Sequence, residues 1–254
     1  MIDMNGSRVV ITGAGGGVGR ALCTAFGSAG AALAGCDLDR DQVPDGCDER
    51  HGFDLRDDAA VARAAGQILA GGVPDVVISN AGWTRAELID QLDPGGYDDE
   101  MARNLGGAAK LCLALLPAMR RDRGARSFVF IASVNAQAHF GNPAYAAAKA
   151  GMLAWMRAIA AEAGADGVRA NAVVPASIRT AAWDHRLEAD PGILDRVSRL
   201  YPLGRLVTPE EVANAALFLA SPLASGITGA ALNVDAGLMA GNLPFVDALS
   251  NLEP

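Results

Sequence analysis

Ser133, Tyr145 and Lys149 lie close together in an otherwise Ala-rich run, SVNAQAHFGNPAYAAAKAG, at residues 133–151. Tyr145 and Lys149 are four residues apart, so on a helix both side chains share one face and can reach one site. Ser133 ends an apolar run that is typical of a buried strand. These residue types predict proton transfer at a substrate oxygen: the phenol moves the proton, and the hydroxyl group holds the oxygen by a hydrogen bond. No His or Asp accompanies Ser133 in a nucleophile-elbow pattern, which argues against acyl transfer.

A glycine-rich stretch, TGAGGGVG at 12–19, follows a strand pattern and leads into a helix pattern. Gly13 allows a tight turn, Gly17 lets the backbone approach a pyrophosphate, and Gly19 lets the helix pack closely on the sheet. The N-terminus of that helix would face the phosphates. A flexible turn is the alternative interpretation, but the flanking strand and helix favour a dinucleotide site.

Asp37 ends the next strand pattern, close to the separation of ~20 residues at which a carboxylate binds the adenosine ribose hydroxyls. That carboxylate would repel a 2′-phosphate, and Leu38 follows it in place of a cation, so we expect NAD. Arg40 leaves NADP open if its side chain turns back towards the ribose. A bound nicotinamide cation and the Lys149 ammonium would both favour a phenolate, so we expect them to lower the pKa of Tyr145 from its ordinary value near ~10.

Short apolar runs that predict buried strands recur along the chain, at 8–12, 31–37, 75–80, 127–133, 168–174 and 231–235. Longer Ala/Leu patterns with helical spacing lie between most of them, at 18–29, 57–70, 98–120, 144–163 and 209–220. Strands that alternate with helices indicate an α/β fold: a Rossmann-like, doubly wound parallel sheet flanked by helices. We expect residues 1–254 to form one dinucleotide-binding and catalytic domain.

The composition excludes several classes of protein. Acidic residues outnumber basic ones, 29 to 21, and we expect no Lys/Arg-rich block able to neutralise a run of phosphates, so nucleic acid is not an expected partner. The four cysteines form no C-x-x-C pair and no metal-ligand spacing with His, so we expect buried thiols and no metal site. The longest apolar stretch, at 111–119, is too short to span a bilayer, and the N-terminus lacks a signal-peptide pattern. We therefore expect a soluble, cytoplasmic protein that has no membrane partner.

From residue 8 to about 240 the chain resembles the short-chain dehydrogenase/reductase family, by motifs that occur in order: TGAGGGVG at 12–19, Asp54 in FDLR, NAG at 80–82, NLGG at 104–107, Ser133, YAAAK at 145–149, VVPASIRT at 173–180, PLGR at 202–205 and ITGAALNVDAG at 227–237. The resemblance implies an enzyme that acts on CH–OH groups with NAD(P). One departure is Ala176, where the family usually has Gly after Pro175; we expect a small backbone shift there and retained binding.

The resemblance assigns roles to further residues. Asp54 would contact the adenine ring, Asn80 would lie beside the cofactor, and Asn104 would serve a water-linked proton path from Lys149. Ile178 and Thr180 would hold the nicotinamide carboxamide. The predicted catalytic set is Asn104, Ser133, Tyr145 and Lys149, and the predicted cofactor set is Gly13, Gly17, Val18, Gly19, Asp37, Leu38, Asp54, Leu55, Asn80, Ala81, Gly82, Tyr145, Lys149, Pro175, Ile178 and Thr180.

Substrate specificity is expected from the segment at about 181–201, which in this family usually forms a helical lid. The predicted substrate residues are Asn135, Gln137, His139 and Trp183; with Trp83, Arg85, Arg179, His185 and Arg186 they would suit a polyhydroxylated or anionic substrate. The alternative is structural, with Trp183 as an anchor and Arg186 paired with Glu188 or Asp190. Likewise Arg120, Arg121, Arg123 and Arg126 are either cations favoured at a helix C-terminus or a docking patch for a carrier protein.

Three functions follow from the sequence. The first is an NAD-dependent alcohol or sugar dehydrogenase, and the second is a 3-oxoacyl-thioester reductase that uses NADPH and recognises an acyl carrier protein or coenzyme A. The third is a dinucleotide-binding regulatory protein without turnover, which would be expected to have a broken Ser-Tyr-Lys set. The resemblance also implies a homo-oligomer, a dimer or tetramer, that pairs the helices at 98–120 and 144–163. Another subunit is a candidate partner for the tail at 241–254.

Overall fold

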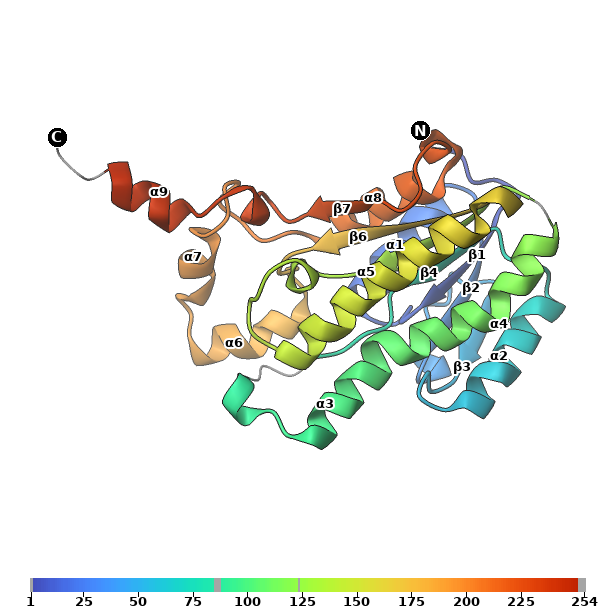
Figure 1. Ribbon diagram of the computed structural model, residues 1–254, viewed down its shortest axis with the longest axis horizontal. Helices are drawn as coiled ribbons and strands as arrows, with labels where there is room; N and C mark the ends of the chain where they lie inside the picture. Colours follow the sequence, from blue (N-terminus) through green and yellow to red (C-terminus); the bar gives the residue numbers. More distant parts are fainter. Residues whose placement is uncertain (1, 85–87, 123, 251–254) are drawn as a thin grey trace.

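The computed structural model describes residues 2–84, 88–122 and 124–250, and in these ranges one parallel sheet of seven strands forms the centre of the molecule (Figure 1). Its strand order is β3-β2-β1-β4-β5-β6-β7, which confirms the doubly wound α/β fold. The order reverses between β1 and β4, where the carboxyl ends of the strands leave a crevice for a ligand. The strands are β1 Arg8–Thr12, β2 Ala32–Asp37, β3 Glu49–Gly52, β4 Val76–Ser79, β5 Arg126–Ile131, β6 Val168–Pro175 and β7 Ala231–Val234.

Helices cover both faces of the sheet (Figure 1). Helices α1 (Gly17–Ser28) and α8 (Pro209–Ala220) pack on each other and on one face, whereas α2 (Asp58–Ala70), α4 (Gly107–Asp122) and α5 (Pro143–Ala163) cover the other. Alternate side chains of β1 feed the two layers: Val9 and Ile11 pack in the α1/α8 layer and Val10 in the opposite one. Because each strand buries both faces, its sequence reads as a continuous apolar run.

The sequence missed β3, and the reason is its composition. Its residues are Glu49, Arg50, His51 and Gly52, which lack the apolar pattern of the other strands, since β3 lies at the edge of the sheet. The helix pattern at 98–120 also differs from the structure, which has α3 (Pro94–Met101), a π-helical segment (Ala102–Gly106) and then α4. Periodicity alone cannot separate these pieces because the chain stays helical throughout.

Helix α8 begins with a capping box at the position that the sequence indicates. The Thr208 hydroxyl group accepts a hydrogen bond from the Glu211 backbone N–H at 3.3 Å, and the Glu211 carboxylate accepts one from the Thr208 N–H at 2.9 Å. Pro209 occupies the first turn. Helix α8 then packs against α1.

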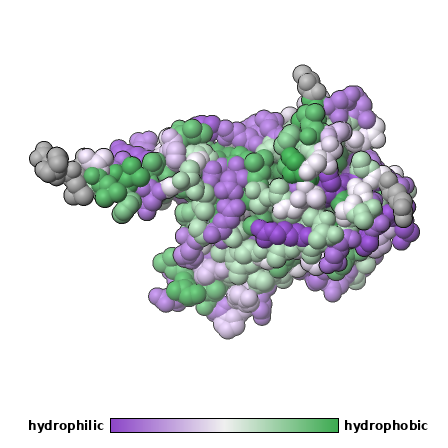
Figure 2. Space-filling model, turned by 45° about the horizontal axis from the view of Figure 1, so that its top comes forward, coloured by the Kyte–Doolittle hydropathy of each residue, from purple (hydrophilic) through white to green (hydrophobic). Residues whose placement is uncertain are grey.

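Two short helices, α6 (Asp184–Ala189) and α7 (Ile193–Ser198), lie within the segment predicted to be a lid. The predicted C-terminal tail contains a further helix, α9 (Leu243–Ser250), which extends away from the sheet at the left of Figure 1. Phe245, Val246 and Leu249 are exposed on it, and Figure 2 shows hydrophobic side chains along this arm.

All four cysteines are buried and have free thiols, and the sulfur atoms of Cys23 and Cys47 lie 3.7 Å apart. Among the described residues, no group of three or more His, Cys, Asp or Glu side chains could hold a metal ion. Within the same ranges, each helix is either too short or too polar to cross a bilayer.

Candidate active site

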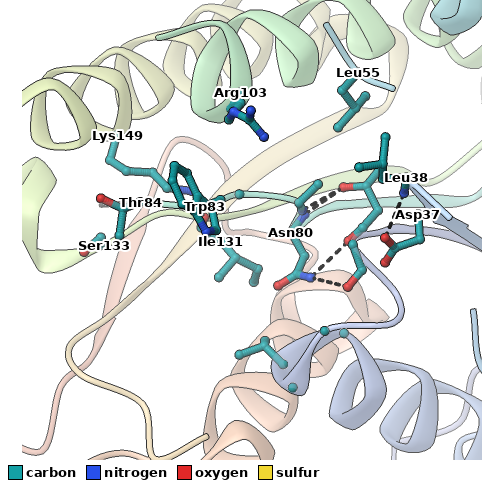
Figure 3. A pocket seen from close by; sticks show the side chains of 18 of the residues that line it. Asp37, Leu38, Leu55, Asn80, Trp83, Thr84, Arg103, Ile131, Ser133 and Lys149 are labelled. Atoms are coloured by element: carbon teal, nitrogen blue, oxygen red, sulfur yellow. Dashed lines mark hydrogen bonds between the residues drawn. The ribbon is translucent and has the colours of Figure 1, made fainter. Parts of the chain in front are cut away.

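A cavity of about 670 Å³ opens at the carboxyl ends of the central strands. Figure 3 shows Asp37 and Leu38 at one end of it and Ser133 and Lys149 at the other, with Asn80 between them. The structure brings the whole predicted cofactor set together here, since each of these residues lines the cavity: Gly13, Gly17, Val18, Gly19, Asp37, Leu38, Asp54, Leu55, Asn80, Ala81, Gly82, Tyr145, Lys149, Pro175, Ile178 and Thr180. The volume and the elongated outline suit a dinucleotide.

The glycine-rich loop is packed so tightly that side chains would not fit. A Cβ atom on Gly19 would lie 1.9 Å from the Gly13 carbonyl oxygen, and one on Gly13 would lie 2.8 Å from the Cα atom of Ala81. Gly13 also has φ +64°, in the left-handed region. The loop therefore delivers the N-terminus of α1 to the cavity wall without a side chain to block it, which fits a pyrophosphate.

Asp37 ends β2, and its carboxylate is held in place by the backbone. Oδ2 accepts a hydrogen bond from the Gly15 N–H at 2.8 Å, and Oδ1 accepts one from the Leu38 N–H at 2.7 Å. Arg40, the cation that kept NADP open, donates through Nε to the Arg50 carbonyl oxygen at 3.1 Å and does not line the cavity. The Asp37 carboxylate is thus presented at this end of the site.

Asn80 joins the end of β4 to the glycine-rich loop (Figure 3). Its Nδ2 donates to the carbonyl oxygens of Thr12 and Gly13 at 3.0 and 3.1 Å. The backbone N–H groups of Asn80 and Ala81 both donate to the Thr12 hydroxyl oxygen at 3.0 Å. Asn80 is therefore positioned as a brace between the two central strands, beside the space for a cofactor.

Two arginines that the sequence analysis did not single out, Arg56 and Arg103, also line the cavity. Hydrogen bonds from Arg56 hold the pKa of Asp54 below its ordinary value, and the Asp54–Arg56 contact is 2.6 Å. Asp99 links the two guanidinium groups, at 3.2 Å from Arg56 and 2.7 Å from Arg103. The i,i+4 spacing of Asp99 and Arg103 was the available signal in the sequence.

Ser133, Tyr145 and Lys149 line one wall of the cavity together. Ser133 follows β5, and its hydroxyl oxygen accepts a hydrogen bond from the Asn135 N–H at 3.2 Å. The Lys149 Nζ donates to the Ile131 carbonyl oxygen at 2.8 Å and lies 5.6 Å from the centre of the Tyr145 ring. The predicted arrangement of phenol and ammonium on one helix face is therefore present.

Helix α5 starts at the right point because three residues force the chain to turn there. Gly141 and Asn142 have φ values of +84° and +51°, and Pro143 occupies the first turn. A left-handed pair cannot continue a helix from the N-terminal side, and Pro is favoured at a helix start. Tyr145 and Lys149 consequently fall in the first two turns, at the cavity.

Burial dominates the ionisation of both groups. Loss of hydration raises the pKa of Tyr145 to about 12, the hydrogen bond with Ser133 opposes this rise, and the charge of Glu100 adds to it. Loss of hydration lowers the pKa of Lys149 to about 8, against an opposing effect of Glu100. Burial thus raises the pKa of Tyr145, whereas the expected decrease depends on the ammonium together with a bound nicotinamide cation.

Asn104 is fully buried in the π-helical segment and does not line the cavity. Its Oδ1 accepts a hydrogen bond from the Trp83 N–H at 3.0 Å, and its Nδ2 donates to the Trp83 carbonyl oxygen at 2.7 Å. The side-chain amide therefore holds the loop that follows Asn80–Gly82. Of the four predicted catalytic residues, Asn104 alone lies behind the cavity wall.

The four predicted substrate residues lie outside the cavity lining. Asn135 donates to the Gly141 carbonyl oxygen at 2.9 Å, Gln137 pairs with Asn233 at 3.0 Å, and His139 is exposed. Trp183 is 7% exposed and packs in the core, as an anchor of the lid segment would.

The charged lid residues mostly have partners. Arg186 lies over the Trp183 ring at 4.9 Å, Arg179 pairs with Asp184 at 3.2 Å, and Asp190 pairs with Arg196 in place of Arg186. In the basic cluster, Arg120 pairs with Asp166, and Arg126 pairs with Asp75 and Asp122. Arg85, Arg123 and the side chain of His185 lie outside the described residues.

Comparison with known proteins agrees with this geometry. A family model described as enoyl-(acyl carrier protein) reductase matches residues 13–239. An uncharacterized oxidoreductase of Schizosaccharomyces pombe is 38% identical over 242 residues, which cover 95% of this chain and 94% of that protein. The crystal structure of an oxidoreductase of the short-chain dehydrogenase/reductase family from Burkholderia thailandensis has a TM-score of 0.88 at 37% identity, covering 97% of this chain and 98% of that one.

Two relatives of named activity are similar over nearly the full chain. The (3R)-3-hydroxyacyl-CoA dehydrogenase of Rattus norvegicus is 32% identical over 256 residues, 93% of this chain and 98% of that protein. The D-threitol dehydrogenase of Mycolicibacterium smegmatis is 32% identical over 245 residues, 92% of this chain and 93% of that protein. The fold, the cavity and these similarities show that the chain belongs to the short-chain dehydrogenase/reductase family, as an NAD(P)-dependent oxidoreductase that acts on CH–OH groups.

Proposed function

We propose that this protein is an NAD-dependent dehydrogenase that interconverts a secondary alcohol or sugar hydroxyl group with the corresponding carbonyl. The observation that carries the proposal is the shared cavity: Ser133, Tyr145 and Lys149 line one end, and Asp37 presents a carboxylate at the other. A dinucleotide that spans the two ends would bring its reactive ring to the Ser-Tyr-Lys wall.

The cofactor would be held by the predicted set, with the pyrophosphate at the start of α1, the adenosine ribose at Asp37 and the carboxamide near Ile178 and Thr180. When bound, the nicotinamide ring supplies the chemistry of hydride donation or acceptance.

Tyr145 removes or supplies the proton at the carbinol oxygen, and the Ser133 hydroxyl group donates a hydrogen bond to that oxygen. Lys149, fixed by the Ile131 carbonyl oxygen, places a positive charge next to the phenol. This charge favours the phenolate that alcohol oxidation requires. Asn104 acts indirectly: it holds the Trp83 main chain in place and does not itself line the cavity.

The preference for NAD rests on charge. A 2′-phosphate on the adenosine ribose would meet the Asp37 carboxylate, and Arg40 is turned to the backbone of β3. Two hydrogen bonds from the backbone leave the carboxylate little freedom to turn away.

A second candidate is a dehydrogenase or reductase of hydroxyacyl thioesters. It is favoured by the similarity to the rat (3R)-3-hydroxyacyl-CoA dehydrogenase and by the description of the matching family model. Against a carrier protein as partner, Arg120 and Arg126 in the basic cluster are already paired with carboxylates. A regulatory protein without turnover is the third candidate, and the intact Ser-Tyr-Lys set argues against it.

Initial rates test the three candidates directly. The panel contains sugars and polyols, secondary alcohols and 3-hydroxyacyl thioesters, each oxidised with NAD and with NADP. NAD-dependent oxidation of a polyol or alcohol supports the proposal, and preferred oxidation of a thioester with NADP replaces it with the second candidate. NAD binding without turnover of any class would favour the third.

We further propose a cytoplasmic homo-oligomer, a dimer or tetramer. The exposed apolar side chains of α9 support the oligomer, since Phe245, Val246 and Leu249 project from an arm that the other described residues leave uncovered. The segment at about 181–201, with α6 and α7, is proposed to be the lid that selects the substrate.

A further inference from the structure

Glu100 is a buried carboxylate next to the candidate active site. It lies in α3, one helical turn before Asn104, and only 2% of its surface is exposed. Asp235 is the other buried carboxylate of the described chain, at 8%, and it accepts hydrogen bonds from the N–H groups of Gly237 and Met239. Asp235 therefore serves a local turn, whereas the contacts of Glu100 lead to the active site.

The first contact of Glu100 is with Asn104. Its Oε2 accepts a hydrogen bond from the Asn104 Nδ2 at 2.7 Å, and its backbone carbonyl oxygen accepts from the same nitrogen at 3.0 Å. The same Nδ2 also donates to the Trp83 carbonyl oxygen, and the Asn104 Oδ1 accepts from the Trp83 N–H. The carboxylate and the Trp83 main chain thus fix together which way the amide faces, because only the NH₂ group can donate to the carboxylate.

Asn104 and Lys149 both lie beside Gly82. A Cβ atom on Gly82 would lie 2.9 Å from the Asn104 Oδ1 and 3.4 Å from the Lys149 Nζ, so both side chains border the same backbone. Glu100, Asn104, Gly82 and Lys149 therefore form one buried cluster behind the cavity wall. Helix α3 packs directly on α5, which carries Lys149.

Charge links the same residues. The negative charge of Glu100 raises the pKa of both Tyr145 and Lys149. Its effect on each pKa is smaller than the effect of burial. The described charged groups around the cluster are Tyr145 and Lys149 on α5 and, along the helical segment of Glu100 itself, Asp99 and Arg103. Of these, Asp99 pairs with both Arg103 and Arg56. Glu100 is thus the anion that faces the catalytic pair.

We propose that Glu100 is a positioning residue of this active site, which orients the Asn104 amide and places a negative charge behind the wall that carries Tyr145 and Lys149. The proposal rests on the proposed function, in which Tyr145 and Lys149 handle the proton of a CH–OH group. The negative charge of Glu100 disfavours the Tyr145 phenolate, so its removal should make the phenol easier to ionise.

The test compares Glu100→Gln, which keeps the shape and a hydrogen-bond acceptor but removes the charge, with Glu100→Asp, which keeps the charge but withdraws it from Asn104. Asp98→Asn is the matched control, since Asp98 is an exposed carboxylate in the same helix. Thermal melting of each variant shows that it is folded. The titration of Tyr145 is measured without turnover, as the ultraviolet absorbance of its phenolate, from the difference between each protein and its Tyr145→Phe counterpart.

We expect the Tyr145 titration in Glu100→Gln to move to lower pH by roughly half a unit or more, and the rising limb of kcat/KM for alcohol oxidation to move with it. Glu100→Asp should keep the titration and lose kcat by about tenfold with little change in KM, because the Asn104 amide is less well held. Asp98→Asn should match the wild type in both. An unchanged titration in folded Glu100→Gln, together with an unchanged kcat in Glu100→Asp, would overturn the proposal.

The titration also separates this proposal from the proposed function. If the wild type oxidises no member of the substrate panel, the proposed function fails while the phenolate titration still reports on Glu100. If the wild type is active but Glu100→Gln titrates as the wild type does, the proposed function stands and the role of the Glu100 charge is refuted.

Discussion

Asn104 pairs with Trp83 as a neighbouring strand would, since its side-chain amide accepts from the Trp83 N–H at 3.0 Å and donates to the Trp83 carbonyl oxygen at 2.7 Å. The Asn104 side chain thereby makes the two hydrogen bonds to Trp83 that the backbone of an adjacent strand would make. The same loop carries Gly82, and a Cβ atom added to Gly82 would lie only 3.4 Å from the Lys149 Nζ. This close approach gives the first prediction.

Gly82→Ala should lower both stability and turnover. The added methyl group would lie 2.9 Å from the Asn104 Oδ1 and 3.4 Å from the Lys149 Nζ, so the loop or the lysine must move. Overpacking of this kind costs about 1–3 kcal/mol. Gly66→Ala in α2 is the control: no atom lies within 4 Å of its added Cβ, and it should stabilise the helix by about 0.5–1 kcal/mol. Denaturant unfolding and kcat measure both variants, and a fully active, equally stable Gly82→Ala protein would contradict the packing described.

Tyr145→Phe should lose turnover by a factor on the order of 10²–10⁴, the usual contribution of a positioned acid or base, while NAD binding is retained. Removal of the hydroxyl group takes away the proton carrier and leaves the cavity wall in place. Tyr97→Phe is the control, since Tyr97 is 43% exposed on α3. Single-turnover rates and fluorescence titration with NAD separate the two effects. Undiminished turnover in Tyr145→Phe would exclude Tyr145 as the acid/base.

Asp37→Asn should reduce the preference for NAD over NADP by roughly 10–100-fold in kcat/KM. A hydrogen bond to a charged acceptor is worth about 1.5–3 kcal/mol, and the carboxylate also repels a 2′-phosphate. Asp39→Asn is the control, because Asp39 caps the following turn through the Asp41 N–H and does not line the cavity. Equal cofactor preference in the wild type and Asp37→Asn would show that selectivity arises elsewhere.

Lys149→Met should change how stability depends on pH. Burial lowers the pKa of Lys149 to about 8 from its ordinary 10.5, so between these values the unfolded chain binds more protons and folding gains stability as pH rises. The free energy of unfolding of the wild type relative to Lys149→Met should therefore rise between about pH 8 and 10.5, by at most about 1.4 kcal/mol per pH unit.

The wild type must be compared with a variant because other buried groups make the free energy of unfolding fall as pH rises. Burial raises the pKa of the Cys36 and Cys112 thiols and of Tyr145, so each removes stability as pH rises above its ordinary value. These contributions cancel between the two proteins. Lys110→Met is the control, since Lys110 is the only other lysine of the sequence and pairs with Asp58 at the surface. A flat difference for Lys149→Met would mean that Lys149 is not desolvated.

Light scattering at micromolar concentration should give a mass of at least twice the 26.0 kDa of the chain. Removal of residues 242–254 should weaken the assembly, because α9 carries the exposed apolar side chains of the arm. A mass near that of one chain for the complete protein would refute the oligomer.

The sheet was predictable because its central strands are buried on both faces and read as apolar runs, as RVVIT does in β1. The edge strand β3 could not be found in the same way, since its side chains Arg50 and His51 bond to Asp45 and Glu49 at the surface and carry no apolar signal. The predicted cofactor residues share the cavity because parallel strands all end at one edge of the sheet.

Other parts of the site depend on three-dimensional contacts that no spacing encodes. Trp183 was predicted to contact the substrate, yet it packs in the core, where it serves as a large apolar anchor for the lid segment. The sequence does not show which way this side chain turns. The pKa direction of Tyr145 likewise depends on desolvation, which is a property of the assembled wall. Arg103 was missed because a charged residue in a helix is usually a solvated one.

The π-helical segment at Ala102–Gly106 changes the direction in which side chains point between α3 and α4. One extra residue in a turn rotates everything beyond it by about 100° relative to an unbroken α-helix. Helix α4 can therefore lay its apolar side on the core while the Asn104 side chain bonds to Glu100 and to the Trp83 main chain. Deletion of Ala102 would keep Arg103 and Asn104 and still change the rotation of Asn104 relative to Glu100, so the segment should tolerate substitution of Ala102 far better than a change of length.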